Sequence, residues 1–154
     1  MRFLLIAALA IATLPAAAHA QTGTIRVGSG DAAMNAAISN ARAGLPEFWR
    51  RFAAPALGEN SFVIKFDLAP EATRTELIWG IVVSHANGVT VARLADTPRD
   101  TRFRMGQQVN VRDVDIVDWG YFRGAVMQGQ FTTRVLLDAI SPTEAAAIRK
   151  AYGW

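Results

Sequence analysis

Two carboxylates are the first candidates for catalysis. Glu76 opens a strongly apolar run, and Asp118 directly precedes Trp119 in a later one. Glycosidases use two carboxylates of this kind, one on each side of the bond that they cleave. The sequence does not fix the separation between Glu76 and Asp118. The structural alternative, which we favour, pairs Glu76 with Lys65 across two antiparallel strands.

A basic loop is the second candidate. Arg99, Arg102 and Arg104 fall within residues 96–104. Guanidinium groups bind carboxylates and phosphates through paired hydrogen bonds, so this loop can hold a small anionic ligand or an acidic protein. Asp96 and Asp100 reduce its net charge. A merely solvated loop is the alternative.

Aromatic side chains on the predicted strands form a third candidate. Trp119 and Tyr121 flank Gly120, which leaves room for a glycan or peptide to approach the backbone. Aromatic residues on strands more often fill the core, and we assign Trp79 to the core for this reason. Lys65, Trp119 and Tyr121 join the three arginines as candidate binding residues.

Metal binding and nucleophilic catalysis find less support. Asp113, Asp115 and Asp118 offer oxygen ligands of the kind that calcium prefers. Their spacing lacks the glycine and glutamate of an EF-hand loop, so we predict a solvated turn. Ser84 and His85 are adjacent on a strand and point to opposite faces, which excludes a nucleophile and base pair. We predict no metal site and no cofactor.

These residues depend on an N-terminal helix and a sheet for their positions. Asp31 is a plausible helix N-cap, and apolar residues from Met34 to Leu45 follow at helical spacing. Pro46 predicts a break or kink, followed by a second short helix.

From Ser61 the apolar period changes to two, as in a half-buried strand, and residues 75–83 are apolar on both faces, as in a central strand. We pair the two strands with Lys65 opposite Glu76 and Asp67 opposite Arg74, because opposite charges across strands attract. The inner face of the second strand is then predicted to hold Leu77, Trp79, Ile81 and Val83.

The remaining elements are marked by turns and caps. Asn87-Gly88 predicts a two-residue hairpin turn, and further strands are expected at 107–111 and on both sides of Arg123-Gly124. Ser141 and Glu144 form a capping box before a last helix. The fold class is therefore α+β: an N-terminal helix broken near Pro46, an antiparallel sheet of about five to six strands, and a C-terminal helix.

The first 20 residues have the pattern of a cleavable signal peptide. Arg2 precedes an uncharged apolar run, which ends at the small residues of Ala18-His19-Ala20. The run is shorter than the ~20 apolar residues that span a bilayer. We therefore expect a signal peptide at 1–20, a loose leader at 21–30 and a single α+β domain at 31–154, with no membrane span after cleavage. The periplasm is the expected location, and secretion from the cell is the alternative.

Charge and composition exclude one class of partner. The chain of 154 residues has no cysteine and a formal net charge of +3, and its basic residues are scattered. Nucleic-acid binders carry a basic stripe or a recognisable module, and neither is present. We expect no nucleic-acid partner.

Six short segments carry a resemblance to a known family: Met34…Phe48, Phe62-Val63-Ile64-Lys65, Glu76…Trp79, Gly106…Val111, Ile116-Val117-Asp118-Trp119 and Gly129…Arg134. Taken in order, they resemble a bacterial family known as domain of unknown function 2314, whose members are often exported. The family often has a histidine where this chain has Leu77, and usually a tyrosine where it has Phe131. Since the family has no established activity, the resemblance implies a fold and little about function.

These observations favour a non-enzymatic binding module of the cell envelope. One sheet face and the 96–104 loop are expected to hold a protein or a small anionic ligand. A toxin-neutralising immunity role fits a small exported domain by analogy. The competing hypothesis is a cell-wall or glycan hydrolase that uses Glu76 and Asp118.

Overall fold

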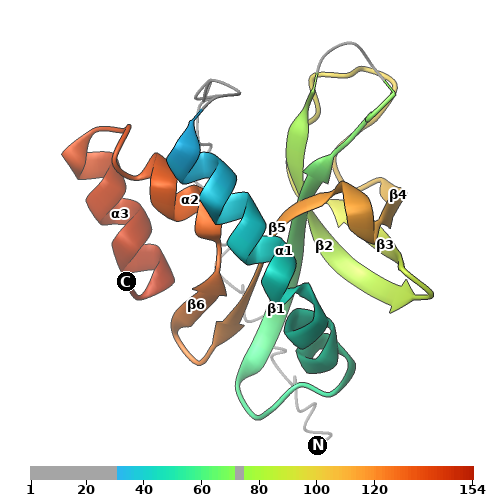
Figure 1. Ribbon diagram of the computed structural model, residues 1–154, viewed down its shortest axis with the longest axis horizontal. Helices are drawn as coiled ribbons and strands as arrows, with labels where there is room; N and C mark the ends of the chain where they lie inside the picture. The colour runs from blue at the N-terminus through green and yellow to red at the C-terminus, as the bar shows by residue number, and fades with distance from the viewer. Residues whose placement is uncertain (1–30, 72–74) are drawn as a thin grey trace, which may run out of the picture.

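The computed structural model describes residues 31–71 and 75–154, and the predicted signal peptide, leader and Asp67–Arg74 pairing lie outside this part of the chain. The described part is α+β, as predicted (Figure 1). Its elements in chain order are α1 (Ala32–Ala53), β1 (Glu59–Asp67), β2 (Leu77–Ala86), β3 (Val89–Leu94), β4 (Gln108–Arg112), η1 (Asp113–Asp115), β5 (Ile116–Arg123), β6 (Val126–Gly129), α2 (Phe131–Leu136) and α3 (Pro142–Tyr152).

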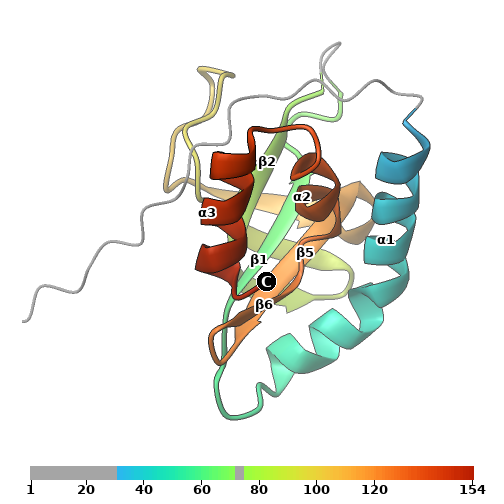
Figure 2. The same ribbon diagram turned by 90° about the vertical axis from the view of Figure 1, so that its left-hand side faces the viewer.

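The six strands form one antiparallel sheet in the order β4-β3-β2-β1-β5-β6. Helix α1 packs on one face of this sheet, and α2 lies between α1 and α3 in both views (Figures 1 and 2). β4 and β6 are therefore the edge strands of the described sheet. None of the described helices is long and apolar enough to cross a bilayer.

Helix α1 begins at the predicted cap, since Asp31 accepts the N–H groups of Ala33 and Met34 at 2.9 and 3.0 Å. Pro46 lies inside one continuous helix, so the predicted break is a change of direction within α1, visible in Figure 2. Proline removes one helical hydrogen bond and crowds the preceding turn, which bends a helix. The helix continues because Leu45 and Phe48, on both sides of Pro46, are buried in the core.

The pairing of β1 with β2 differs from the prediction. Lys65 lies opposite Trp79, and Phe66 lies opposite Ile78. The buried face of β2 consequently carries Ile78 and Val82, while Trp79 is only partly buried on the other face. The prediction was wrong because it chose the register from charges at the strand ends. Lys65 lies three residues further along β2 than expected, and a shift by an odd number of residues exchanges the two faces of a strand.

The β2–β3 hairpin turns at Asn87-Gly88 as predicted, with both residues at positive φ. Next to the turn, Ser84 pairs with Val91, but beyond it Val82 pairs with Ala92. A bulge at Val83 accounts for this shift of one residue and leaves Val83 exposed.

The C-terminal region has a small core of its own. α3 begins at the predicted capping box of Ser141 and Glu144. Leu137, Ala145 and Ile148 are buried together, and Trp154 packs against them. The indole N–H of Trp154 donates to the backbone oxygen of Met127 at 2.9 Å, which fixes the last residues against β6.

Candidate functional site

Glu76 and Asp118 do not form a shared catalytic pair in the structure. The Glu76 carboxylate accepts the backbone N–H groups of Arg99 and Asp100 at 2.6 and 3.1 Å. It therefore closes the base of the 96–104 loop. The expected pair between Glu76 and Lys65 is not formed. Its role in the structure is to hold a loop.

Asp118 is fully buried and accepts four hydrogen bonds from the protein. The donors are the backbone N–H groups of Trp119, Phe131 and Thr132, at 2.7–3.1 Å, and the Thr132 hydroxyl, at 2.6 Å. Burial raises the pKa of the Asp118 carboxyl, against the effect of these hydrogen bonds. Gln130, the N-cap residue of α2, makes no side-chain cap, so Asp118 supplies this cap from β5.

Lys65 belongs to the same buried cluster, because it lies opposite Asp118 on the sheet face away from α1. Its ammonium group donates to the Thr132 hydroxyl at 3.3 Å and lies 5.6 Å from the centre of the Trp79 ring. Burial lowers the pKa of Lys65, while the charges of Asp118 and Asp96 act in the opposite direction.

The Lys65–Thr132–Asp118 cluster joins three of the segments that carry the family resemblance: 62–65, 116–119 and 129–134. The Thr132 hydroxyl accepts a hydrogen bond from Lys65 and donates one to Asp118, so the three side chains form a continuous chain of hydrogen bonds. A buried polar network with every member satisfied gives rigidity to a fold. The cluster ties β1 and β5 to the start of α2.

The two candidate binding aromatics lie in the core under α1. The Trp119 indole donates to the backbone oxygen of Ala41 at 2.7 Å, and Trp119 is 8% exposed. Tyr121 is 4% exposed and stacks on Phe62, with ring centres 5.0 Å apart. Both rings therefore attach the helix to the sheet.

The arginines of the 96–104 loop are held largely by contacts near their own backbone. The Arg102 guanidinium pairs with the Asp100 carboxylate, with N–O distances of 2.6–3.1 Å. The backbone N–H of Arg99 is bound by Glu76, and that of Arg104 donates to the Gln107 side chain at 3.1 Å. The Asp100 carboxylate thus already occupies the place that an anionic ligand of Arg102 would take.

The aspartates of the D-x-D-x-x-D pattern point to separate partners. Asp113 contacts His85, whose Nε2 is 3.1 Å away and whose ring stacks on Trp49 at 3.8 Å. Asp115 pairs with Arg112 at 2.8 Å, and Asp118 is buried under α2. In residues 31–71 and 75–154, no group of three or more His, Cys, Asp or Glu side chains is placed to hold a metal ion.

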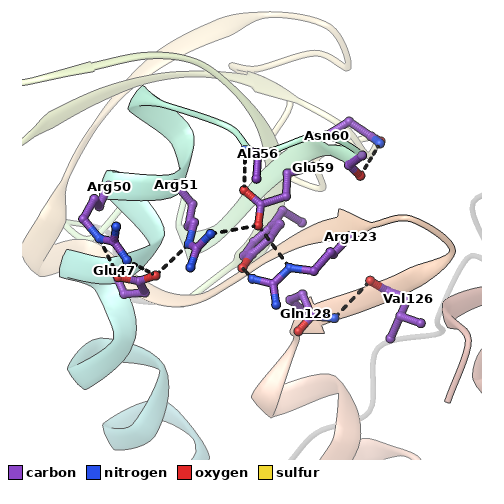
Figure 3. A network of polar contacts seen from close by, with 11 residues as sticks. Glu47, Arg50, Arg51, Ala56, Glu59, Asn60, Arg123, Val126 and Gln128 are labelled. Carbon is purple, nitrogen blue, oxygen red and sulfur yellow. Dashed lines mark hydrogen bonds and ion pairs between the residues drawn. The ribbon is translucent and has the colours of Figure 1, made fainter.

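A second polar network, which the sequence did not indicate, joins the end of α1 to the sheet (Figure 3). The Glu59 side chain is fully buried and accepts the Ala56 N–H at 2.9 Å and the Arg123 guanidinium at 3.0 Å. The Ala56 N–H and Arg123 lower the pKa of Glu59. Arg51 contacts both Glu59, at 3.4 Å, and Glu47, at 2.7 Å.

An open pocket of about 710 Å³ lies between β1, β4 and the 96–104 loop. We call it the edge pocket. Its apolar lining comes from Phe66, Leu68, Phe103, Val109 and Val111, and its charged lining from Asp67, Glu71, Arg112 and Asp115. Neither Glu76 nor Asp118 lines it.

The curvature of the sheet brings the walls of the edge pocket together. A Cβ atom at Gly80 would lie 3.0 Å from both Phe66 and Ala92, so a glycine there lets the strands approach. The bulge at Val83 increases the local twist. The glycine and the apolar alternation of β4 are visible in the sequence, but their combined effect on the distance between β1 and β4 is not.

This α+β chain belongs to the family described as "Uncharacterized protein conserved in bacteria (DUF2314)", whose model matches residues 31–154. It is also similar to the "Uncharacterized protein YegJ" of Escherichia coli (strain K12), with 30% identity over 91 residues. The matched segment is 58% of this chain and 59% of that relative, so the likeness spans little more than half of each. No solved structure matches the chain.

Proposed function

We propose that this chain is an exported, non-enzymatic binding module of the bacterial cell envelope that holds a partner protein in the edge pocket. The observation that carries the proposal is the pocket itself, which is open, about 710 Å³ in volume and lined in part by apolar side chains. This volume lies within the range of roughly 300–1,000 Å³ that is common for binding pockets. The pocket combines one sheet face with the 96–104 loop, through Phe103.

A protein segment fits the edge pocket better than a small anion does. Three carboxylates and one guanidinium line the pocket, and that guanidinium, on Arg112, already pairs with Asp115. The nearby Arg102 is engaged by Asp100. A small anion would meet net negative charge, whereas an apolar segment can bury Phe103 and Val109.

The arrangement of the two candidate catalytic carboxylates supports a binding role over hydrolysis. A general acid or nucleophile must reach the substrate. The Glu76 carboxylate is bound by two backbone N–H groups, and that of Asp118 by four donors without solvent exposure. Both carboxylates thus have structural roles. An immunity-like role remains one form that the binding function can take.

The apolar run at 3–18 and the small residues at 18–20 support export. N-terminal sequencing of the protein recovered from the periplasm tests this part of the proposal, and a start at Gln21 is expected. Full-length protein in the cytosol, beginning at Met1, would contradict it.

The binding function is tested with two matched variants on opposite edge strands. Val109→Asp places a charge in the lining of the edge pocket, and Val126→Asp places one on β6, where the valine is 41% exposed. A partner captured from the cell envelope by the wild type is then purified and its affinity measured directly. Binding is expected to fall with Val109→Asp and to persist with Val126→Asp, provided that both variants keep the wild-type circular dichroism spectrum. Equal binding by the two variants would refute the assignment of the site.

A further inference from the structure

Strand β4 offers unpaired backbone groups along one side of the edge pocket. Leu94 donates its N–H to the Gln107 oxygen, and Val109 and Val111 lie opposite Ala92 and Thr90 in the same register. In an antiparallel ladder, alternate residues direct both backbone groups to the neighbouring strand. Residues 107, 109 and 111 therefore face β3. Gln108, Asn110 and Arg112 direct their N–H and C=O groups outward, and no strand of the described sheet lies beyond them.

The opposite edge of the sheet is not open in this way. On β6 the corresponding outward oxygens belong to Met127 and Gly129. The Trp154 indole donates to the first at 2.9 Å, and the Arg134 guanidinium donates to the second at 3.1 Å. The unpaired edge is therefore the one beside the pocket.

The edge pocket lies along β4, beside the position that an added strand would occupy. Val109 and Val111 point to the sheet face that α1 partly covers, and Val111 is buried there. Residues 109–112 all line the pocket, so the pocket follows the strand along its length. A strand added to β4 would direct alternate side chains to this same face, toward Phe66, Leu68 and Phe103.

The charges around the pocket indicate what the other residues of such a strand should be. Asp67, Glu71 and Asp115 contribute three negative charges and Arg112 one positive charge. Glu71 is 70% exposed and lies 3.9 Å from Arg102, which Asp100 already binds at 2.6 Å. A lysine or arginine on the incoming strand would balance this excess negative charge.

We infer that the edge pocket takes an extended segment of a partner protein, with apolar and basic residues in alternation, that adds to β4 as a further strand. The inference rests on the proposed binding function and specifies how the partner is recognised. Strand addition gives affinity through main-chain hydrogen bonds and specificity through pockets for alternate side chains. A second copy of this chain fits less well. The basic residue on its β4 is Arg112, which already pairs with Asp115 and so does not balance the negative charge of the pocket.

The test begins with a displayed library of random linear peptides, selected against the folded chain. The selected peptides are expected to alternate apolar and basic residues. Binding of a selected peptide is then compared between Asn110→Pro, which removes an outward N–H, and Asn110→Ala, which keeps it. Proline is tolerated on edge strands where its missing N–H would face outward. We expect about a tenfold or greater loss for Asn110→Pro relative to Asn110→Ala.

Peptides that are N-methylated at alternate positions give a second measurement on the wild-type chain, in case Asn110→Pro does not fold. Methylation in one phase is expected to abolish binding, and methylation in the other phase to leave it intact. Equal binding of both methylated forms would overturn strand addition, as would selected peptides without alternation.

The outcomes also separate this inference from the proposed function. If no peptide is selected but an envelope protein binds and is lost with Val109→Asp, the binding function stands and strand addition is wrong. If the chain dimerises in sedimentation experiments and Asn110→Pro abolishes the dimer, the occupant is a second copy. If neither peptides nor envelope proteins bind, both proposals fail.

Discussion

Thr132 donates both its backbone N–H and its hydroxyl to the same oxygen of Asp118, at 2.7 and 2.6 Å. Through this contact a residue of β5 caps a helix that begins a dozen residues later in the chain. The Asp118 carboxylate is fully buried and accepts hydrogen bonds from four donors, so its loss would leave these donors unpaired.

Replacement of Asp118 is expected to destabilise the fold strongly. Asp118→Ala leaves the N–H groups of Phe131 and Thr132 without an acceptor, which costs about 2–4 kcal/mol of unfolding free energy. Urea denaturation measures the loss. Asp115→Ala is the matched control and should cost under about 1 kcal/mol, because Asp115 belongs to an exposed pair with Arg112. Equal effects of the two substitutions would contradict the capping role.

Lys65 should make the free energy of unfolding depend on pH in the alkaline range. Burial lowers its pKa from 10.5, so between the lowered value and 10.5 the unfolded chain binds more protons than the folded one. Stability relative to the Lys65→Met variant therefore rises with pH in this window. Urea denaturation of both proteins at several pH values tests this, and a flat or falling difference would refute it.

Glu59 should make the free energy of unfolding depend on pH in the acidic range. Its pKa is lowered from 4.5, first by the Ala56 N–H, so the stability that its ionised form adds is present above pH 4.5. This stability is lost as the pH falls through the lowered folded pKa. The advantage of the wild type over Glu59→Gln should shrink over that range in thermal melts. An advantage that grows on acidification would show that the network of Figure 3 does not stabilise the ionised form.

Gly44 is a position where the usual effect of alanine in a helix should be reversed. Alanine normally stabilises a helix by about 1 kcal/mol relative to glycine. Here a Cβ atom would lie 2.7 Å from the Trp119 ring, which the bond to Ala41 holds in place. We expect Gly44→Ala to lose about 1–3 kcal/mol through overpacking. Asn40→Ala, on the exposed side of the same helix, should gain about 0.5 kcal/mol, and a gain for both would contradict the fixed position of Trp119.

The sequence predicts the local elements of this fold well, because their signals are local. Asp31, Asn87-Gly88 and the capping box of Ser141 each act on backbone groups within a few residues. Pro46 was expected to break or kink the N-terminal helix and to begin a second one. The kink is found and the break is not, because residues distant in the chain bury Phe48 beyond Pro46 and the helix continues.

Register and site geometry depend on distant residues, and here the sequence is a weaker guide. In the β2–β3 hairpin, the register that the Asn87-Gly88 turn implies is correct next to the turn. It shifts by one residue at the Val83 bulge, for which the sequence has no clear signal. Lys65 and Asp118 were both singled out, but with the wrong partners. Their actual link, Thr132, lies on a third segment that only the folded chain brings near.

The two edges of the sheet also set a limit on self-association. Trp154 and Arg134 occupy the outward oxygens of β6, so β4 is the one edge of the described sheet that a neighbouring molecule can continue. Growth into fibrils requires two open edges on each subunit, because every added molecule must offer a new one. With a single open edge, pairing stops at two molecules, and crowded solutions of this protein should contain finite species rather than polymers.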